Sequence, residues 1–227
     1  MEELLDNILL SDDPVKMFYH FYNENKEFKN WLLELLPEVE KASNLNQDNP
    51  WHIYNCLDHI LHSVEMMNRS SKKLDIRGRK VLAYTMFFHD LGKPKCHIKR
   101  FSKRYDREVD SFPFHNKESV AIFNRVRDHF SFTSKEKELI ELLIDQHDIF
   151  MFITLNEGDN RKVLTDELLE KYLEEYSEVD NPYKVMKYLI MVGRSDNLAQ
   201  NPLLTKESLH LLDVMEEMLN NYKNNRK

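Results

Sequence analysis

The sequence predicts an all-α fold, in which a bundle of helices surrounds a buried site. The chain of 227 residues has only 4 glycines and 7 prolines while 31% of it is charged, so turn-forming residues are scarce and long helices are favoured. Apolar side chains also recur at the three- and four-residue spacing of helix faces. We expect a single domain over 1–227, with a helical extension at 1–45, a core at 46–200 and a closing helix at 201–227.

Composition argues against several classes of protein. The formal net charge of −7 argues against broad nucleic-acid binding. No apolar run reaches the roughly 18 residues of a membrane span, so no membrane association is expected. Cys56 and Cys96 form no Cys-x-x-Cys pair, and the opening residues are acidic where a signal peptide is basic. These features predict a cytoplasmic protein.

Residues 1–45 predict two or three amphipathic helices. The clearest spans 28–36 and ends near Pro37, while Asp12 or Asp13 before Pro14 marks a helix start. Aromatic residues lie here at helical spacing, which favours packing in a core or against a partner over a cofactor box. Packing against a second copy would make a homo-oligomer, and the sequence leaves this open. The aromatic residues are Phe18, Tyr19, Phe21, Tyr22, Phe28 and Trp31.

A helix expected over 52–69 carries three histidines. Helical periodicity places His59 where the helix meets the core and His62 on the solvated face. We therefore select His59 as a candidate metal ligand and interpret His62 as an ordinary surface histidine. His52, at the expected helix start, is interpreted as structural. The apolar stripe that orients the helix is Ile53, Leu57, Ile60, Val64 and Met67.

The strongly apolar segment 81–91 predicts a buried central helix. Its end carries His89 and Asp90 side by side, after which Gly92 and Pro94 stop the helix. An ionised carboxylate buried there costs on the order of several kcal/mol unless something compensates its charge. A bound metal cation is one such compensation, and it also recruits a neutral imidazole. His89 and Asp90 are therefore candidate ligands.

A polar loop is expected next, at 95–113. Its positive charge exceeds its negative charge, and beside His89 and Asp90 this suits an anionic substrate, most simply a phosphate. A merely solvated loop is the alternative. The chain has no glycine-rich phosphate-binding motif. The basic residues are Lys95, Lys99, Arg100, Lys103, Arg104 and Arg107.

Two more histidines come from the following helices. His115 sits at the entrance of a helix, from where its side chain can turn inward, and His129 on the same helix is a competitor. Ser134, with Lys137-Glu138, predicts a capping box that opens the next helix. His147 continues the buried stripe of that helix, where a lone core histidine is the default interpretation. The other histidines that face inward weaken this default, and His147 is therefore also a candidate ligand.

Residues 151–180 predict a loop and an acidic helix at 166–178. The apolar helix that starts at Pro182 ends, like the central helix, in an ionisable cluster. Asp196 continues its buried stripe, so the cost of burying a carboxylate applies again and Asp196 is a candidate ligand. A salt bridge between Asp196 and Arg194 is the alternative.

Together these segments offer four imidazoles and two carboxylates. A mixed set of nitrogen and oxygen ligands suits one or two Mn, Fe, Co, Ni or Zn ions better than Mg alone, although Mg stays an option. The candidate metal ligands are His59, His89, Asp90, His115, His147 and Asp196.

The order of these ligands, with Leu91-Gly92-Lys93 after the central pair, resembles the HD superfamily of metal-dependent phosphohydrolases. Flanking stretches sharpen the resemblance to the HD half of bacterial CCA-adding tRNA nucleotidyltransferases. The similar region runs from about 32 to 148 and resumes at 196–199. The flanks are Leu-Pro-Glu at 36–38, Gln-Asp-Asn-Pro-Trp-His-Ile-Tyr at 47–54 and Asp-His at 58–59.

The resemblance implies an HD-domain helical bundle around a buried metal site, with extra N- and C-terminal helices. It also implies that a metal-bound hydroxide hydrolyses a phosphomonoester or phosphodiester, namely a nucleotide or a related small phosphorylated substrate. One ion would be held by His59, His89, Asp90 and Asp196, and a second by Asp90, His115 and His147. Asp90 and Lys93 would be catalytic. The substrate would be bound by Lys93, Lys95, Lys99, Arg100 and Arg194.

Two departures from the tRNA enzymes limit what the resemblance implies. These residues contain no counterpart of the nucleotidyltransferase head, so nucleotide addition to tRNA is not expected. The usual Gly-His-Glu around the third histidine is Phe114-His115-Asn116 here. Two other functions share the ligand set: an HD-type diiron oxygenase and a noncatalytic metal-containing ligand-binding module. The basic loop and the tRNA-enzyme flanks favour hydrolysis over both.

Overall fold

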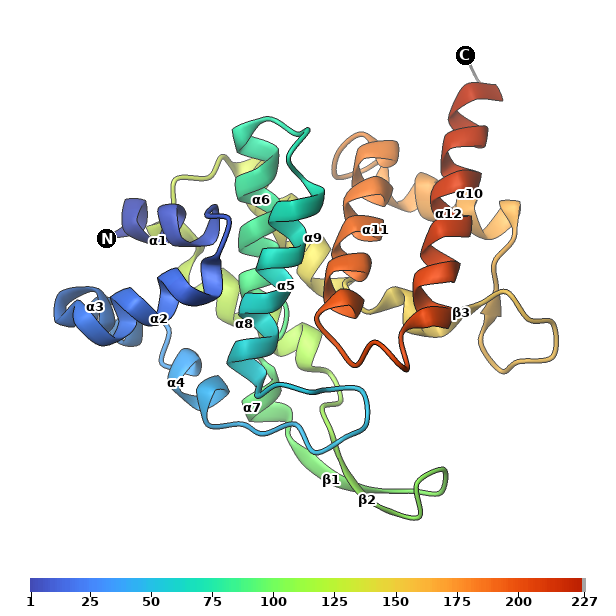
Figure 1. Cartoon of the computed structure of the whole chain (residues 1–227). Helices are drawn as coiled ribbons and strands as arrows, with labels where there is room; N and C mark the ends of the chain where they lie inside the picture. The colour runs from blue at the N-terminus through green and yellow to red at the C-terminus, as the bar shows by residue number, and fades with distance from the viewer. Residues whose placement is uncertain (226–227) are drawn as a thin grey trace.

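The computed structural model describes residues 1–225, and most of this part of the chain is helical, as predicted (Figure 1). Two 3-10 turns are η1 (Arg127–His129) and η2 (Ile149–Phe152). The α-helices are α1 (Glu2–Leu9), α2 (Pro14–Glu24), α3 (Lys26–Leu35), α4 (Glu38–Ser43), α5 (Cys56–Ser70), α6 (Ile76–Phe88), α7 (Lys93–Cys96), α8 (His115–Val126), α9 (Ser134–Asp145), α10 (Asp166–Tyr176), α11 (Pro182–Leu198) and α12 (Lys206–Asn225).

Short strands interrupt this helical architecture. The segment 95–113, expected to be a polar loop, contains the end of helix α7 and a hairpin of β1 (Ile98–Ser102) and β2 (Arg107–Ser111). The hairpin projects from the helical body (Figure 1). The strands pair antiparallel, from Ile98 opposite Ser111 to Ser102 opposite Arg107. A second, parallel pair joins β3 (Ile153–Thr154) to β4 (Lys162–Val163). The loop prediction was wrong here because opposite charges such as Lys99 and Asp110 face each other across the strands, a pairing that charge composition alone does not reveal.

Side-chain caps determine where several helices begin. Asp13 accepts a hydrogen bond from the backbone N–H of Lys16 and so caps α2, with Pro14 in its first position, as predicted. The capping box of α9 is formed by Thr133 and Glu136, one position before the predicted start at Ser134. Both residues can cap a helix, but only Thr133 has a glutamate three positions later to return the hydrogen bond.

Helix α6 is the centre of the fold. Every residue from Lys80 to Phe88 is buried, which is what a helix with apolar side chains on all faces requires. Helices α1 to α4 pack on one side of α5 and α6, and α10 to α12 lie on the other (Figure 1). Phe18 and Phe28 are fully buried, and the ring of Phe18 lies 6.4 Å from that of Phe87, so these N-terminal aromatic residues belong to the core. In residues 1–225, no helix is long and apolar enough to cross a membrane.

The close approach of α8 to the end of α6 depends on Gly92. A Cβ atom at this position would lie 2.3 Å from the carbonyl oxygen of His115 and 2.6 Å from the backbone nitrogen of Ser119. The backbone N–H of Gly92 also donates to the hydroxyl of Ser119 at 2.9 Å. Any larger residue would therefore push the first turn of α8, and His115 with it, away from Asp90.

We expect Gly92→Ala to destabilise the protein by about 1–3 kcal/mol or more, because the added methyl group meets backbone atoms that cannot rotate away. Urea unfolding measures the change. Gly78→Ala is the matched control: its Cβ would meet the hydroxyl of Tyr188, the far end of a movable side chain, and should cost less. Equal losses for the two variants would contradict the packing described here.

Candidate metal centre

Five segments of the chain bring the six predicted ligands to one point. His59 comes from α5, His89 and Asp90 follow α6, and His115 is the first residue of α8. His147 follows α9, and Asp196 lies in the last turn of α11. The side chains form two groups that share Asp90, and within each group the candidate ligand atoms lie within 4.8 Å of one another. The first group is His59, His89, Asp90 and Asp196, and the second is Asp90, His115 and His147.

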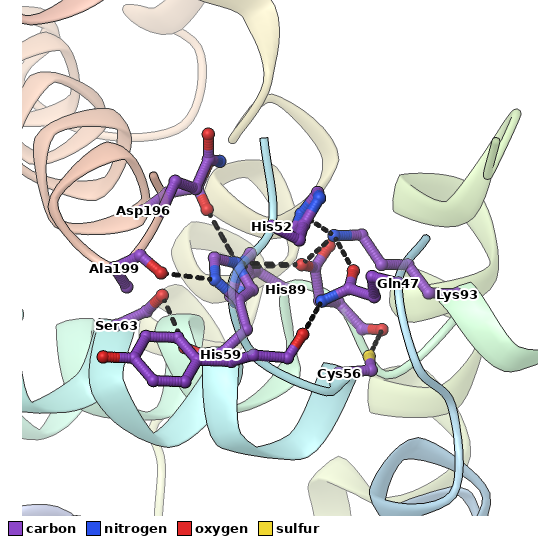
Figure 2. A network of polar contacts seen from close by, with 12 residues as sticks. Gln47, His52, Cys56, His59, Ser63, His89, Lys93, Asp196 and Ala199 are labelled. Carbon is purple, nitrogen blue, oxygen red and sulfur yellow. Dashed lines mark hydrogen bonds and ion pairs between the residues drawn. The ribbon is translucent and has the colours of Figure 1, made fainter. Parts of the chain in front are cut away.

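In the first group, two imidazoles face two carboxylates. Nε2 of His59 lies 3.2 Å from Oδ2 of Asp90 and 2.9 Å from Oδ1 of Asp196. Nε2 of His89 lies 3.3 Å and 3.6 Å from the same two oxygens. Figure 2 shows these side chains meeting between α5, α6 and α11. The side chains of His59, His89 and Asp90 are buried, whereas that of Asp196 is 16% exposed.

In the second group, the other oxygen of Asp90 faces the remaining histidines. Oδ1 of Asp90 lies 3.2 Å from Nε2 of His115 and 3.7 Å from Nε2 of His147. The two Nε2 atoms are 3.1 Å apart. The carboxylate of Asp90 therefore stands between two pairs of imidazoles, with one oxygen directed to each pair.

Backbone carbonyl groups orient all four imidazoles in the same way. Nδ1 lies at hydrogen-bond distance from a carbonyl oxygen in each ring, at 2.6 Å in His89 and up to 3.2 Å in His59. A carbonyl oxygen can only accept, so each Nδ1 carries a proton and donates it. In the neutral tautomer this leaves Nε2 with a free lone pair, directed at the centre of the cluster, as in histidines that bind metals. The carbonyl acceptors belong to Ala199, Met86, Phe112 and Ile144 for His59, His89, His115 and His147.

The buried polar atoms of the cluster fit a cation. Nε2 of His59, Nε2 of His89 and both carboxylate oxygens of Asp90 are buried, and these atoms face one another inside the cluster. Leaving buried polar atoms unsatisfied is costly, and these atoms converge on one another rather than on separate neighbours. Nitrogen and oxygen atoms in this proportion suit a divalent transition metal. The residues present could therefore hold one or two metal ions, whose identity the donor set does not decide.

Without a cation, protons must compensate the carboxylates. Burial favours the neutral acid, but the charges of His89 and Lys93 outweigh it and hold the pKa of Asp90 well below its usual value. Burial lowers the pKa of His89, but Asp90 and Asp196 outweigh it and raise the pKa to about 10. The pKa of His147 is lowered to about 4 by burial and by the neighbouring imidazoles of His115 and His89. The cluster thus carries protonated imidazoles where a metal would need neutral ones.

Lys93 is built into this cluster through contacts that local sequence does not predict. Its ammonium group lies 2.5 Å from Oδ2 of Asp90, 2.9 Å from Oε1 of Gln47 and 3.0 Å from Nε2 of His52 (Figure 2). An ammonium group has three protons, so all its donors face acceptors inside the protein. Lys93 therefore holds Asp90 in place, and it can reach a substrate only by giving up one of these contacts.

Gln47 and His52 are site residues that sequence reasoning missed. His52 was interpreted as part of a helix start, but α5 begins at Cys56 and His52 lies in the preceding turn. Because Nε2 of His52 accepts from Lys93, its Nδ1 carries the proton, 2.8 Å from Oδ1 of Asn49. Lys93 is more than forty positions away in sequence, so no local periodicity could have indicated the contact.

The base of the hairpin supports the loop that carries Gln47 and His52. The backbone N–H of Asp48 donates to the carboxylate of Asp110 at 2.7 Å, and the N–H of Asp110 donates to the carbonyl of Asp48 at 2.9 Å. Asp110 is buried and also pairs with His97 and Lys99. The hairpin predicted as a loop is thus connected to the cluster through Asp48.

Most of the other basic residues selected from the sequence have partners elsewhere. Lys95 pairs with Glu118 on the surface, and Arg194 pairs with Asp213 and Glu216 of α12. Lys99 pairs with Asp110 and Asp48, while Arg100 is exposed on β1. Of the five residues selected for substrate binding, the structure places Lys93 within the cluster. The alternative salt bridge between Arg194 and Asp196 does not form, because Asp196 faces His59 and His89 instead.

Two further histidines lie outside the cluster. His62 is partly exposed, as expected, pairs with Glu65 and stacks on the ring of Tyr54. His129, which periodicity placed on the same stripe as Ile122 and Val126, is exposed in η1 instead. The chain leaves the α-helical path after Val126, so the stripe of α8 does not extend to His129.

Comparison of the chain with models of protein families and with curated proteins finds no match in either. A helical protein with this buried cluster of histidine and aspartate is consistent with an HD-type metal site, which the cluster by itself does not prove.

We expect the metal-free protein to lose stability as the pH rises from 7 to 9. The pKa values of His59 and His89 in the folded protein are raised above the ordinary 6.5. The protonated imidazoles therefore stabilise the fold fully below pH 6.5. This stabilisation is lost as the pH rises toward the pKa in the folded protein, which is about 10 for His89. The loss amounts to about 1.4 kcal/mol per pH unit for His89, and the raised pKa of His59 adds a loss in the same direction. Urea unfolding with a chelator present measures it.

Saturating Mn²⁺ should reverse the sign of this dependence. Ligating imidazoles must be neutral, so a rising pH removes the protons that compete with the metal and strengthens its binding. Stability that falls equally with and without Mn²⁺ would contradict a metal centre in this cluster.

Proposed function

We propose that the protein is a metal-dependent phosphohydrolase of the HD type, which acts on a small phosphomonoester or phosphodiester such as a nucleotide. The observation that carries the proposal is the shared carboxylate of Asp90, whose two buried oxygens each face a pair of imidazoles. A carboxylate between two sets of nitrogen ligands is suited to bridging two divalent ions, the arrangement used in hydrolysis of phosphate esters.

Each residue of the cluster has a role in this proposal. His59, His89, Asp90 and Asp196 would hold one ion, and Asp90, His115 and His147 a second. When bound, the ions supply an activated water and neutralise negative charge on the phosphoryl oxygens. The carbonyl groups that accept from Nδ1 keep each Nε2 directed inward. Lys93 keeps the shared carboxylate ionised and oriented.

Exposed cations on the hairpin support an anionic substrate. The hairpin presents Arg100 and Lys103 exposed to solvent, in a protein whose net charge is negative. Such cations would attract a phosphate ester and would not be needed for an uncharged substrate.

A diiron oxygenase is the second candidate, because four imidazoles with two carboxylates also suit a pair of iron ions. Purified protein that retains iron and consumes oxygen, without releasing phosphate from any ester, would favour that function. Metal retention with neither reaction would favour a noncatalytic ligand-binding module.

We expect His59→Ala to abolish stoichiometric metal binding and to lower phosphate release at least about a hundredfold, because it removes a ligand directed at the centre. Elemental analysis, together with a screen of phosphomonoesters, phosphodiesters and nucleotides in Mn²⁺, Co²⁺ or Ni²⁺, measures both. His62→Ala is the matched control, since His62 lies on the same helix but pairs with Glu65 outside the cluster. The site assignment would be wrong if the two variants behaved alike.

We expect Lys93→Met to destabilise the metal-free protein by about 3–5 kcal/mol, because it leaves the buried carboxylate of Asp90 without its closest cation. Saturating Mn²⁺ should recover most of this loss, since the metal replaces the missing charge. Urea unfolding with chelator and with Mn²⁺ compares the two states. Lys95→Met, which removes an exposed surface pair, should change stability by less than about 1 kcal/mol.

A further inference from the structure

Lys93 and the first group of candidate metal ligands use the same oxygen of Asp90. Nζ of Lys93 lies 2.5 Å from Oδ2 of Asp90, and Nε2 of His59 and of His89 lie 3.2 Å and 3.3 Å from that oxygen. A divalent ion held by this group would repel the ammonium group, because like charges interact strongly in a buried site. When a cation is bound, Lys93 must therefore either leave the cluster or be held by other acceptors.

Leaving the cluster is costly for Lys93. Its side chain is 6% exposed, and a buried ammonium group without acceptors is strongly destabilising. Its backbone is also fixed, since Gly92 is packed against the first turn of α8. The ring of Phe112 faces the ammonium group, with its centre 5.4 Å from Nζ. Other acceptors are therefore needed to keep the ammonium group inside the protein.

Gln47 and His52 supply two acceptors that carry no charge. Oε1 of Gln47 lies 2.9 Å and Nε2 of His52 3.0 Å from Nζ of Lys93 (Figure 2). The imidazole of His52 is neutral, since its Nε2 accepts from the ammonium group while its Nδ1 donates to Oδ1 of Asn49. Neither acceptor depends on the charge of Asp90, so both remain available when a cation binds there.

The loop that carries both acceptors is held from two sides. Asp110 of β2 bonds to the backbone N–H and the carbonyl of Asp48, at 2.7 Å and 2.9 Å. On the other side, the backbone N–H of Asn201 donates to the carbonyl of Trp51 at 2.8 Å, and its side-chain amide donates to the carbonyl of Pro50 at 3.0 Å. Neither attachment involves the ammonium group, so the acceptors stay in place when its contact with the carboxylate weakens.

We propose that Gln47 and His52 are positioning residues for metal loading, which hold the ammonium group of Lys93 while a divalent cation shares Asp90 with it. This rests on the proposed function, of which it uses the metal centre and not the hydrolysis. Without either acceptor, the ammonium group depends more strongly on Oδ2 of Asp90 and competes with the cation for that oxygen. The pair therefore strengthens metal binding although neither residue is a metal ligand.

Calorimetric titration of the whole chain with Mn²⁺, after treatment with a chelator, tests this role without any substrate. We expect His52→Ala and Gln47→Met each to weaken Mn²⁺ binding about 10- to 100-fold, as loss of residues that orient metal ligands does. Gln47→Met keeps the length of the side chain and removes the acceptor. His52→Gln, whose amide oxygen can take the place of Nε2, should restore most of the affinity that His52→Ala loses.

A double-mutant cycle with Lys93→Met separates this role from a general structural one. His52→Ala also removes a ring whose centre lies 5.1 Å from that of His59, and the loss of this contact does not involve Lys93. If the acceptors act through the ammonium group, neither substitution should weaken Mn²⁺ binding further in the Lys93→Met protein. His62→Ala, on α5 outside the cluster, is the control and should bind Mn²⁺ like the wild type.

Labelling of Lys93 by an amine-reactive reagent, located by mass spectrometry, gives a second measurement in the folded protein. In the wild type, Lys93 should react slowly both with a chelator and with saturating Mn²⁺, because the two acceptors hold it in either state. In Gln47→Met and His52→Ala it should react faster when Mn²⁺ is bound. Urea unfolding identifies a variant that does not fold, and the other variant then provides the test.

The outcomes separate this inference from the proposed function. The inference is wrong if both variants bind Mn²⁺ like the wild type, if they weaken binding equally without Lys93, or if Mn²⁺ exposes Lys93 of the wild type to labelling. Phosphate release by the wild type would then leave the hydrolase standing. Weakened Mn²⁺ binding that depends on Lys93, with no phosphate released from any ester, would support the inference and contradict the hydrolase. A wild-type protein that binds no Mn²⁺ would overturn both.

Discussion

The buried carboxylate of Asp90 is the constraint on which the rest of the structure depends. It lies at the end of the central helix with 1% of its side chain exposed, where an unpaired charge would cost several kcal/mol on an order-of-magnitude scale. Four imidazoles and one ammonium group surround its two oxygens, and they come from α5, the end of α6, the start of α7, the start of α8 and the segment after α9. The helices pack as they do partly because each brings a group that this carboxylate requires.

Further contacts hold in place the groups that compensate the charge of Asp90. Backbone carbonyl groups fix each imidazole so that Nε2 points inward, and Gln47 and His52 fix Lys93. The loop that carries these two residues is attached in turn to the hairpin through Asp48 and Asp110. The hairpin on the surface therefore has a structural connection to Asp90. The arrangement provides both rigidity and orientation, which a site for positioning a metal requires.

The same arrangement explains why the cluster favours a cation. Neutral imidazoles would direct their lone pairs at the carboxylate oxygens, and protonated imidazoles satisfy those oxygens at the cost of burying several charges. A divalent ion satisfies nitrogen and oxygen atoms at once, which protons cannot do in this geometry. The proposed hydrolase uses this property at the phosphate.

His89 and Asp90 were selected because they end an apolar segment, and His115 because it stands at a helix entrance. Periodicity along single helices was enough to predict most of the fold and the remaining cluster residues, because it determines which side of its own helix a residue occupies. It separated His59 from His62 and placed Asp196 on a buried stripe. It could not determine which segment packs opposite, so the contacts of Lys93 with Gln47 and His52, the pairing of Arg194 with α12, and the hairpin emerged only from the tertiary structure. The contacts of Lys93 and Arg194 join residues far apart in sequence, whereas the hairpin pairs two strands of one short segment, and the packing of the chain decides both.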